Sequence, residues 1–149
     1  MTTPPLRSSG NRLRIRIGLG IVILGLVVFL LGAKPSFFGL DRSPGTGFVE
    51  IAVFEIGLAL ICLGGYISLS ALWNGREKTI AADIGLRLVS TGYVISVASG
   101  MADVLGFGSQ TLPNIPYFGP WQAVGTMIGE VVVAVGFLLL IPPRNPKSK

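Results

Sequence analysis

The chain has 149 residues, of which half are hydrophobic and only 13% are charged, with a formal net charge of +5. Soluble domains carry roughly 25% charged residues, so this composition excludes an ordinary soluble domain and indicates an integral membrane protein. Nine of the twelve lysines and arginines lie in short segments that flank apolar runs, which is typical of membrane topology and not of a nucleic-acid-binding surface.

The chain begins with a polar segment, and the apolar runs come after it. Residues 1–16 are rich in proline, serine and arginine, and are predicted to be a basic disordered tail. The uncharged run 17–33 is just long enough to cross a hydrocarbon core of about 30 Å as a helix. A basic segment before an apolar run is also typical of a signal peptide, but this run is long for that role and is followed by a poor cleavage site. We therefore predict a first transmembrane span.

Three more apolar runs, at 48–73, 80–105 and 121–141, predict three further spans. The connections between them are rich in glycine, proline or polar residues, and a basic tail, 142–149, follows two prolines that end the last run. The predicted fold is an all-α integral membrane protein in which residues 17–141 form four transmembrane helices in an antiparallel up-down bundle.

The positions of the basic residues predict the orientation. With four spans, the two tails and the central turn lie on one side and carry nine lysines and arginines, whereas the other side carries two, Lys34 and Arg42. Cytoplasmic loops are enriched in basic residues, so both termini are predicted to be cytoplasmic, and a bacterial plasma membrane is the default compartment.

Glycines recur at intervals of seven in all four runs. Helices in lipid associate where small residues allow close approach, and a seven-residue repeat keeps such a stripe facing one partner. The predicted helix-packing residues are Gly25, Gly57, Gly64, Gly85, Gly92, Gly129 and Gly136. Chance recurrence in a chain with 21 glycines is the alternative.

Six charged residues lie within these runs. Ionisable groups in a span cost roughly 2.5–3.5 kcal/mol on insertion scales and usually face protein or water. The candidate intramembrane charge site comprises Glu55, Asp83, Arg87 and Glu130. Glu50 and Asp103 lie near the outer ends of their spans and are predicted to be carboxylates at a helix mouth, within reach of water.

Glycine and charge fall on opposite faces of two spans. Asp83 and Arg87 are four residues apart, so they can pair on the face opposite Gly85, and Glu55 lies opposite Gly57. Either a charged helix is central in the bundle, or its second face contacts another protein or a second copy of the chain. The competing interpretation is an internal contact between Arg87 and Glu130, with Glu55 hydrogen-bonded inside the bundle.

The residues predict no enzyme. The chain has no histidine and one cysteine, Cys62, which is expected to be a small packing residue, so we expect no metal site and no cofactor. No motif places a nucleophile beside a base. The expected function is an accessory, scaffold or assembly subunit of a membrane complex or homo-oligomer, whose partners are the lipid bilayer and other membrane subunits or a second copy.

Two other functions remain open. The first is a small proton- or cation-coupled transporter or channel, in which Glu55 and Glu130 carry the ion and Arg87 is a counter-charge. The second is an intramembrane enzyme acting on lipid, with Asp83, Arg87 and the basic turn near the headgroups.

Overall fold

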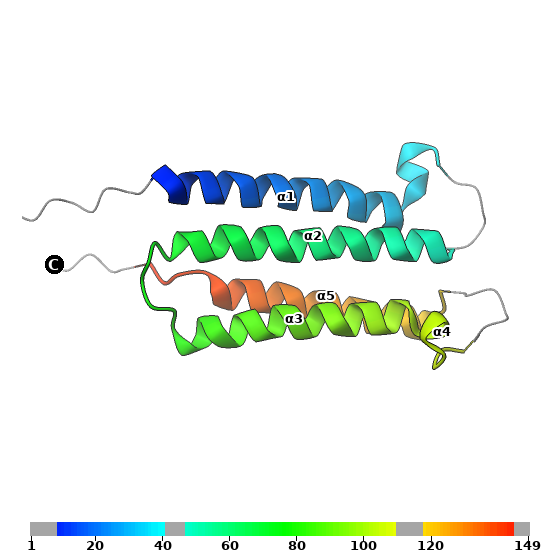
Figure 1. Cartoon of the computed structure of the whole chain (residues 1–149). Coiled ribbons are helices and arrows are strands. Elements are labelled where there is room, and N and C mark those ends of the chain that lie inside the picture. Colours follow the sequence, from blue (N-terminus) through cyan, green and yellow to red (C-terminus); the bar gives the residue numbers. More distant parts are fainter. Residues whose placement is uncertain (1–8, 41–46, 110–117, 145–149) are drawn as a thin grey trace, which may run out of the picture.

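A computed structural model of the protein describes residues 9–40, 47–109 and 118–144, and within these ranges the regular elements are helices (Figure 1). In chain order they are α1 (Ser9–Ala33), η1 (Pro35–Phe38), α2 (Phe48–Leu72), α3 (Ile80–Gly100), α4 (Ala102–Leu105) and α5 (Pro120–Leu140). The helices α1, α2, α3 and α5 are each long and apolar enough to cross a membrane. An all-helical fold with four helices of spanning length is therefore confirmed.

Two helix boundaries differ from the prediction. The α1 helix begins at Ser9 and not at residue 17, so much of the segment predicted to be a disordered tail is helical. Arginine is a good helix former, and its long side chain can reach water from a helix that enters lipid. The predicted run 80–105 is divided at Met101, whose φ of −94° and ψ of 14° separate α3 from α4.

The glycines of α1 and α2 bring the two backbones into direct contact. Gly25 faces Gly57, and a methyl group added at Gly25 would lie 2.9 Å from the carbonyl oxygen of Gly57. Gly18 faces Gly64, and a methyl group added at Gly64 would lie 2.6 Å from the carbonyl oxygen of Gly18. Because these distances leave no room for a side chain, the stripe sets how closely the helices approach.

The pair formed by α3 and α5 repeats this arrangement. Gly92 faces Gly129, and a methyl group at Gly92 would lie 2.6 Å from the carbonyl oxygen of Gly129. Gly85 faces Gly136 in the same way, at 2.5 Å. The chain is thus built as two similar helical hairpins, which we call the first hairpin (α1 and α2) and the second hairpin (α3 and α5).

The second helices of the two hairpins also begin alike. The backbone N–H of Gly47 donates a hydrogen bond of 3.0 Å to the carboxylate of Glu50, and that of Gly119 donates one of 2.5 Å to the side-chain oxygen of Gln122. In each case the side chain of the third helical residue satisfies a donor at the helix start, which lacks a partner within the helix. The resemblance between the hairpins therefore extends to their helix caps.

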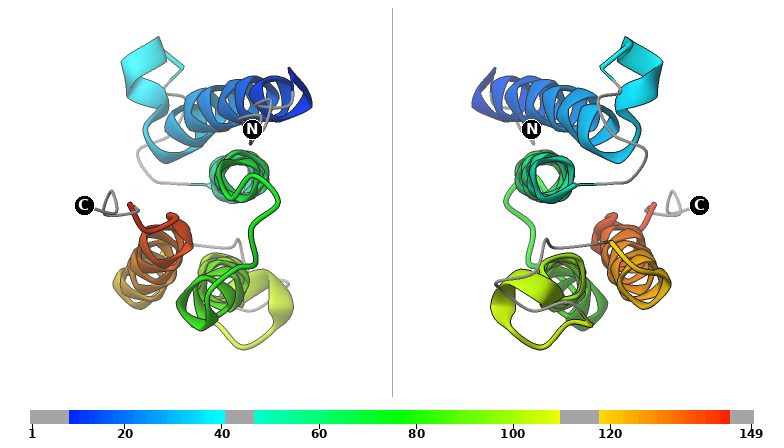
Figure 2. Two further views of the ribbon diagram at one scale, coloured as in Figure 1. Left: turned by 90° about the vertical axis from the view of Figure 1, so that its left-hand side faces the viewer. Right: turned by 90° about the vertical axis from the view of Figure 1, so that its right-hand side faces the viewer.

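The α2 helix lies in the middle of the molecule. Figure 2 shows α1 on one side of α2 and the pair α3 and α5 on the other. Residues are buried on both sides of α2, with Gly57 and Gly64 against α1 and Glu55 toward the second hairpin. The sequence left two alternatives for a helix with a charged second face, a central position in the bundle or a contact with another protein. For α2 the structure agrees with the central position (Figure 2).

A tryptophan joins the two hairpins at one end. Trp73, only 4% exposed, donates a hydrogen bond of 2.9 Å from its indole nitrogen to the carbonyl oxygen of Leu140, the last residue of α5. Together with Ala82 these residues form a small buried cluster. An indole N–H that is buried needs an acceptor, and here the C-terminus of α5 supplies one of its free carbonyl groups.

Candidate functional site

Glu55 lies at the interface between the two hairpins. It extends from α2 and is only 4% exposed, and the hydroxyl group of Ser96 on α3 donates a hydrogen bond of 3.1 Å to its Oε1 atom. Ser96 is itself completely buried. Since a polar group removed from water is costly unless it is hydrogen-bonded, α3 supplies the partner that the acidic residue of α2 needs.

A third helix contributes to this cluster. A methyl group at Gly100 on α3 would lie 2.8 Å from Oε1 of Glu55 and 3.6 Å from Oγ1 of Thr126 on α5, so the glycine leaves room for both groups. Oε2 of Glu55 and Oγ1 of Thr126 are buried without a hydrogen-bond partner in the described part of the chain. Two oxygen atoms from two hairpins thus retain hydrogen-bonding capacity inside the protein.

A crevice of about 260 Å³ opens beside this cluster, between α1, α2 and α5. Its lining consists of Phe29, Ala33, Phe54, Phe118, Ala123, Thr126, Met127 and Glu130. Phe54 packs edge-on against Phe29 and Phe118, with ring centroids 5.9 and 6.1 Å apart. Thr126 and the half-buried Glu130 are the polar groups of the crevice and lie one turn apart on α5. Thr126 therefore links the crevice to the carboxyl group of Glu55.

Asp83 and Arg87 do not join this cluster. Both are exposed on α3, whereas Gly85 on the same helix is buried against Gly136. The exposed residues Ser90 and Thr91 continue the same face. The structure thus places Glu130 in the crevice and buries Glu55 between the hairpins, whereas the other two predicted charges lie on the outside of the bundle.

The two carboxylates predicted at the outer helix mouth differ in their surroundings. Glu50 caps the start of α2 through its hydrogen bond with Gly47. Asp103 lies in α4 and is only 2% exposed, beside Gly108 in the turn that follows. Asp103 is therefore buried, and not within reach of water as predicted.

The seven predicted packing glycines all lie against a neighbouring helix backbone. Sequence reasoning missed Ser96, Thr126 and Trp73, because these residues carry no spacing signal of their own. The burial of Gln122, 7% exposed, was also missed. Its position three residues after Gly119, as Glu50 follows Gly47, is a signal that could have found it.

Comparison of the chain with models of known protein families, with curated proteins and with solved structures found no match. Among the described residues there is no group of three or more cysteine and acidic side chains that could hold a metal ion. The function must therefore be argued from the geometry of this chain.

Proposed function

We propose that this protein is a non-catalytic multi-pass membrane subunit that assembles with a second copy of itself through the outer face of α3. In this proposal the four long helices cross the bilayer as an antiparallel bundle. The first residues of α1 and the last residues of α5 lie at the same end of the molecule (Figure 1). The nine basic residues of the tails and central turn favour a cytoplasmic position for that end, and a bacterial plasma membrane is the proposed location.

The observation that carries the proposal is the polarity of an exposed helix face. Asp83, Arg87, Ser90 and Thr91 are all exposed on α3, in a helix that is otherwise suited to span a membrane. The glycine face of α3 is already covered by α5. Polar and charged groups in a span face protein or water much more often than lipid. A protein partner on this face would satisfy these groups.

The charges on this face complement a second copy of the same face. In a two-fold dimer with its axis along the membrane normal, two α3 helices run parallel, so equivalent residues lie at the same height. Arg87 is about 6 Å along the helix from Asp83 at 1.5 Å per residue, which is within reach of its long side chain. Each Arg87 can then pair with Asp83 of the other copy, and Ser90 lies next to its own equivalent.

Disulfide cross-linking in membranes tests this contact. In a Cys62→Ala background, Ser90→Cys should form a cross-linked dimer on mild oxidation. Ile23→Cys on α1 is the matched control, because Ile23 holds the same register relative to Gly25 as Ser90 does relative to Gly92 and is 56% exposed. A cross-link through Ile23 but not through Ser90 would show that α3 is not the interface.

Charge reversal tests the pairing itself. Asp83→Arg and Arg87→Asp should each weaken the dimer in mild detergent, and the double variant should restore it. A dimer whose stability is indifferent to all three variants would contradict the proposed pairing, even if the copies associate by another surface.

A second function is favoured by the crevice. Glu55 and Thr126 each have a buried oxygen without a partner among the described residues, and Thr126 lines the crevice together with Glu130. A proton- or cation-coupled transporter needs carboxyl groups of this kind within the membrane. Liposomes that contain the protein should then show flux that Glu130→Gln abolishes while the protein still folds. Arg87, on the outer face of α3, has no part in this version of the site.

A further inference from the structure

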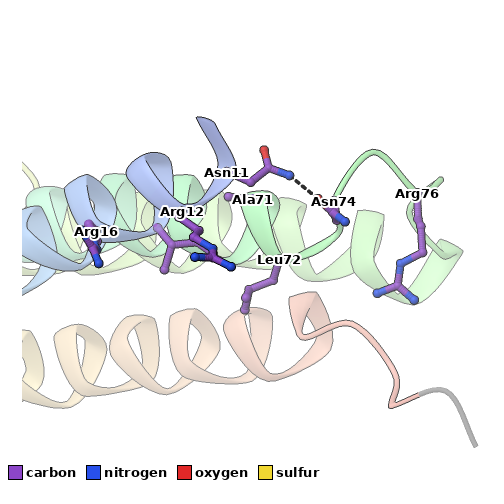
Figure 3. A pocket seen from close by; sticks show the side chains of 8 residues that line it. Asn11, Arg12, Arg16, Ala71, Leu72, Asn74 and Arg76 are labelled. Carbon is purple, nitrogen blue, oxygen red and sulfur yellow. Dashed lines mark hydrogen bonds between the residues drawn. The ribbon is translucent and has the colours of Figure 1, made fainter. Parts of the chain in front are cut away.

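A second cavity, of about 610 Å³, lies where α1 begins and α2 ends (Figure 3). Its lining residues are Asn11, Arg12, Ile15, Arg16, Ala71, Leu72, Asn74 and Arg76. Among these eight described residues three are arginines and none is acidic. The cavity therefore concentrates positive charge at one end of the bundle, far along the helices from the crevice that contains Glu130.

The walls of this cavity are held by specific contacts. The side-chain amide of Asn11 donates a hydrogen bond to the side-chain oxygen of Asn74, which ties α1 to the turn after α2. Asn74 adopts a left-handed backbone conformation, with φ of 51°, that asparagine tolerates better than most residues. Arg76 donates a hydrogen bond of 3.2 Å from Nε to the carbonyl oxygen of Trp73 and lies over its indole ring.

Arg12 and Arg16 lie one turn apart on the same face of α1, and both side chains line the cavity (Figure 3). Arg14 lies between them in sequence but does not line the cavity. Guanidinium groups bind phosphate oxygens in a bidentate manner, so Arg12 and Arg16 suit a phosphate group, while Arg76, apart from them on the other wall (Figure 3), adds positive charge to the cavity.

The height of the cavity distinguishes a lipid from a soluble anion. The uncharged run of α1 starts directly after Arg16, and the apolar part of α2 ends at Leu72. The cavity thus lies where the hydrocarbon core meets the headgroup layer, and Ile15 and Leu72 add hydrocarbon to its walls. Basic pockets between transmembrane helices on the cytoplasmic side recognise anionic headgroups.

We propose that this cavity binds the phosphate headgroup of an anionic glycerophospholipid, with its acyl chains against the apolar surface of α1. The inference rests on the membrane topology proposed above, but not on the dimer, because the cavity lies on the first hairpin and the dimer contact on the second. The lipid would stabilise the junction that Asn11 and Asn74 make between the start of α1 and the end of α2.

Native mass spectrometry of the full chain released from nanodiscs tests the proposal. The nanodiscs contain phosphatidylcholine with graded amounts of phosphatidylglycerol, and the measurement is the number of phosphatidylglycerol molecules retained. Arg12→Gln and Arg16→Gln should each reduce the apparent affinity about tenfold, as expected for the loss of a hydrogen bond to a charged group, and Arg76→Gln should reduce it less. Arg14→Gln removes the same charge outside the cavity and should leave the retained lipid unchanged.

The other outcomes each overturn a defined part of the proposal. An equal loss in Arg14→Gln, or equal retention of phosphatidylcholine, would show that the cavity does not select the anionic headgroup. Displacement of the lipid by soluble glycerol 3-phosphate at low millimolar concentration would make this a site for a free phosphate compound and not for a lipid. Insertion without any retained lipid overturns this inference alone, whereas failure to insert overturns the proposed membrane function.

Discussion

The two hairpins share one packing mechanism but present different outer surfaces. Both are closed by facing glycines seven residues apart, and both second helices begin with the same cap. When the glycines are aligned, Ile23 and Leu24 of α1 correspond to Ser90 and Thr91 of α3, and all four residues are exposed. The glycine stripe therefore determines which helices pair, whereas the opposite face determines whether the pair meets lipid or another surface.

The second helices of the hairpins differ as well. The α2 helix is central and buries Glu55 against the second hairpin, whereas the corresponding position of α5 is Met127, which is 61% exposed. Identical hairpins would have no reason to pack asymmetrically. Glu55 on α2, which accepts a hydrogen bond from Ser96 on α3, distinguishes the inner face of the first hairpin from that of the second.

The largest expected effect comes from filling the glycine contacts. Gly57→Val and Gly129→Val occupy corresponding positions and place a side chain within 3 Å of the opposite backbone. Each should destabilise the protein by about 3 kcal/mol or more, at the upper end for overpacking, because backbone atoms cannot move aside as side chains do.

Gly20 is the matched control for these variants. It lies in α1 with nothing within 4 Å of an added methyl group, so Gly20→Ala should be neutral or stabilising by up to about 1 kcal/mol. Thermal unfolding in detergent, followed by size-exclusion chromatography, measures all three. If Gly129→Val folds normally and Gly57→Val does not, the two hairpins are not held in the same way.

The next effect sharpens the comparison of the outer faces. The variant Ser90→Ile with Thr91→Leu gives α3 the corresponding residues of α1. Dimerisation should weaken by about tenfold, or 1.4 kcal/mol, while the isolated chain should unfold no more easily in detergent. A stronger dimer would show that the face associates by apolar packing and not through its polar groups.

A smaller effect is expected at the joint between the hairpins. Ser96→Ala removes the hydroxyl group that donates a hydrogen bond to the buried carboxyl group of Glu55. The free energy of unfolding should fall by about 1–3 kcal/mol as a result. Ser90→Ala, at an exposed serine on the same helix, is the control and should change the unfolding temperature of the isolated chain little. Equal effects of the two variants would contradict a specific role for Ser96.

The smallest effect concerns the tryptophan at the end of the bundle. Trp73→Phe keeps most of the buried ring but removes the hydrogen bond to Leu140, so a loss of about 1 kcal/mol is expected. Hydrogen exchange should report faster opening at the last turn of α5 and no change near Gly57. Uniformly faster exchange would mean that Trp73 stabilises the whole bundle and not this end alone.

The periodicities in the sequence predicted the parts of the fold that depend on local composition. Long apolar runs predicted four helices of spanning length, and α2 and α5 begin and end within one residue of their predicted bounds. The exceptions are the early start of α1 and the break at Met101. Hydropathy alone cannot predict either boundary. It does not measure the helix propensity of the arginines at the start of α1, nor the backbone conformation that Met101 adopts.

The candidate site was predictable only in part. Helical geometry placed Glu55 opposite Gly57, and this angle agrees with the structure. It could not show that α2 is central, that Ser96 and Thr126 would meet Glu55, or that Arg87 would lie outside. An angle around one helix axis says nothing about which neighbour occupies that direction.

The sequence by itself determined the number of long helices, their glycine-lined faces and the positions of the charges along them. These properties are local, because hydropathy and a seven-residue spacing act within a single helix. Only the tertiary structure decided which charges are buried together, since the packing of one hairpin on the other depends on a few polar contacts between residues far apart in the chain, such as Glu55 with Ser96 and Trp73 with Leu140.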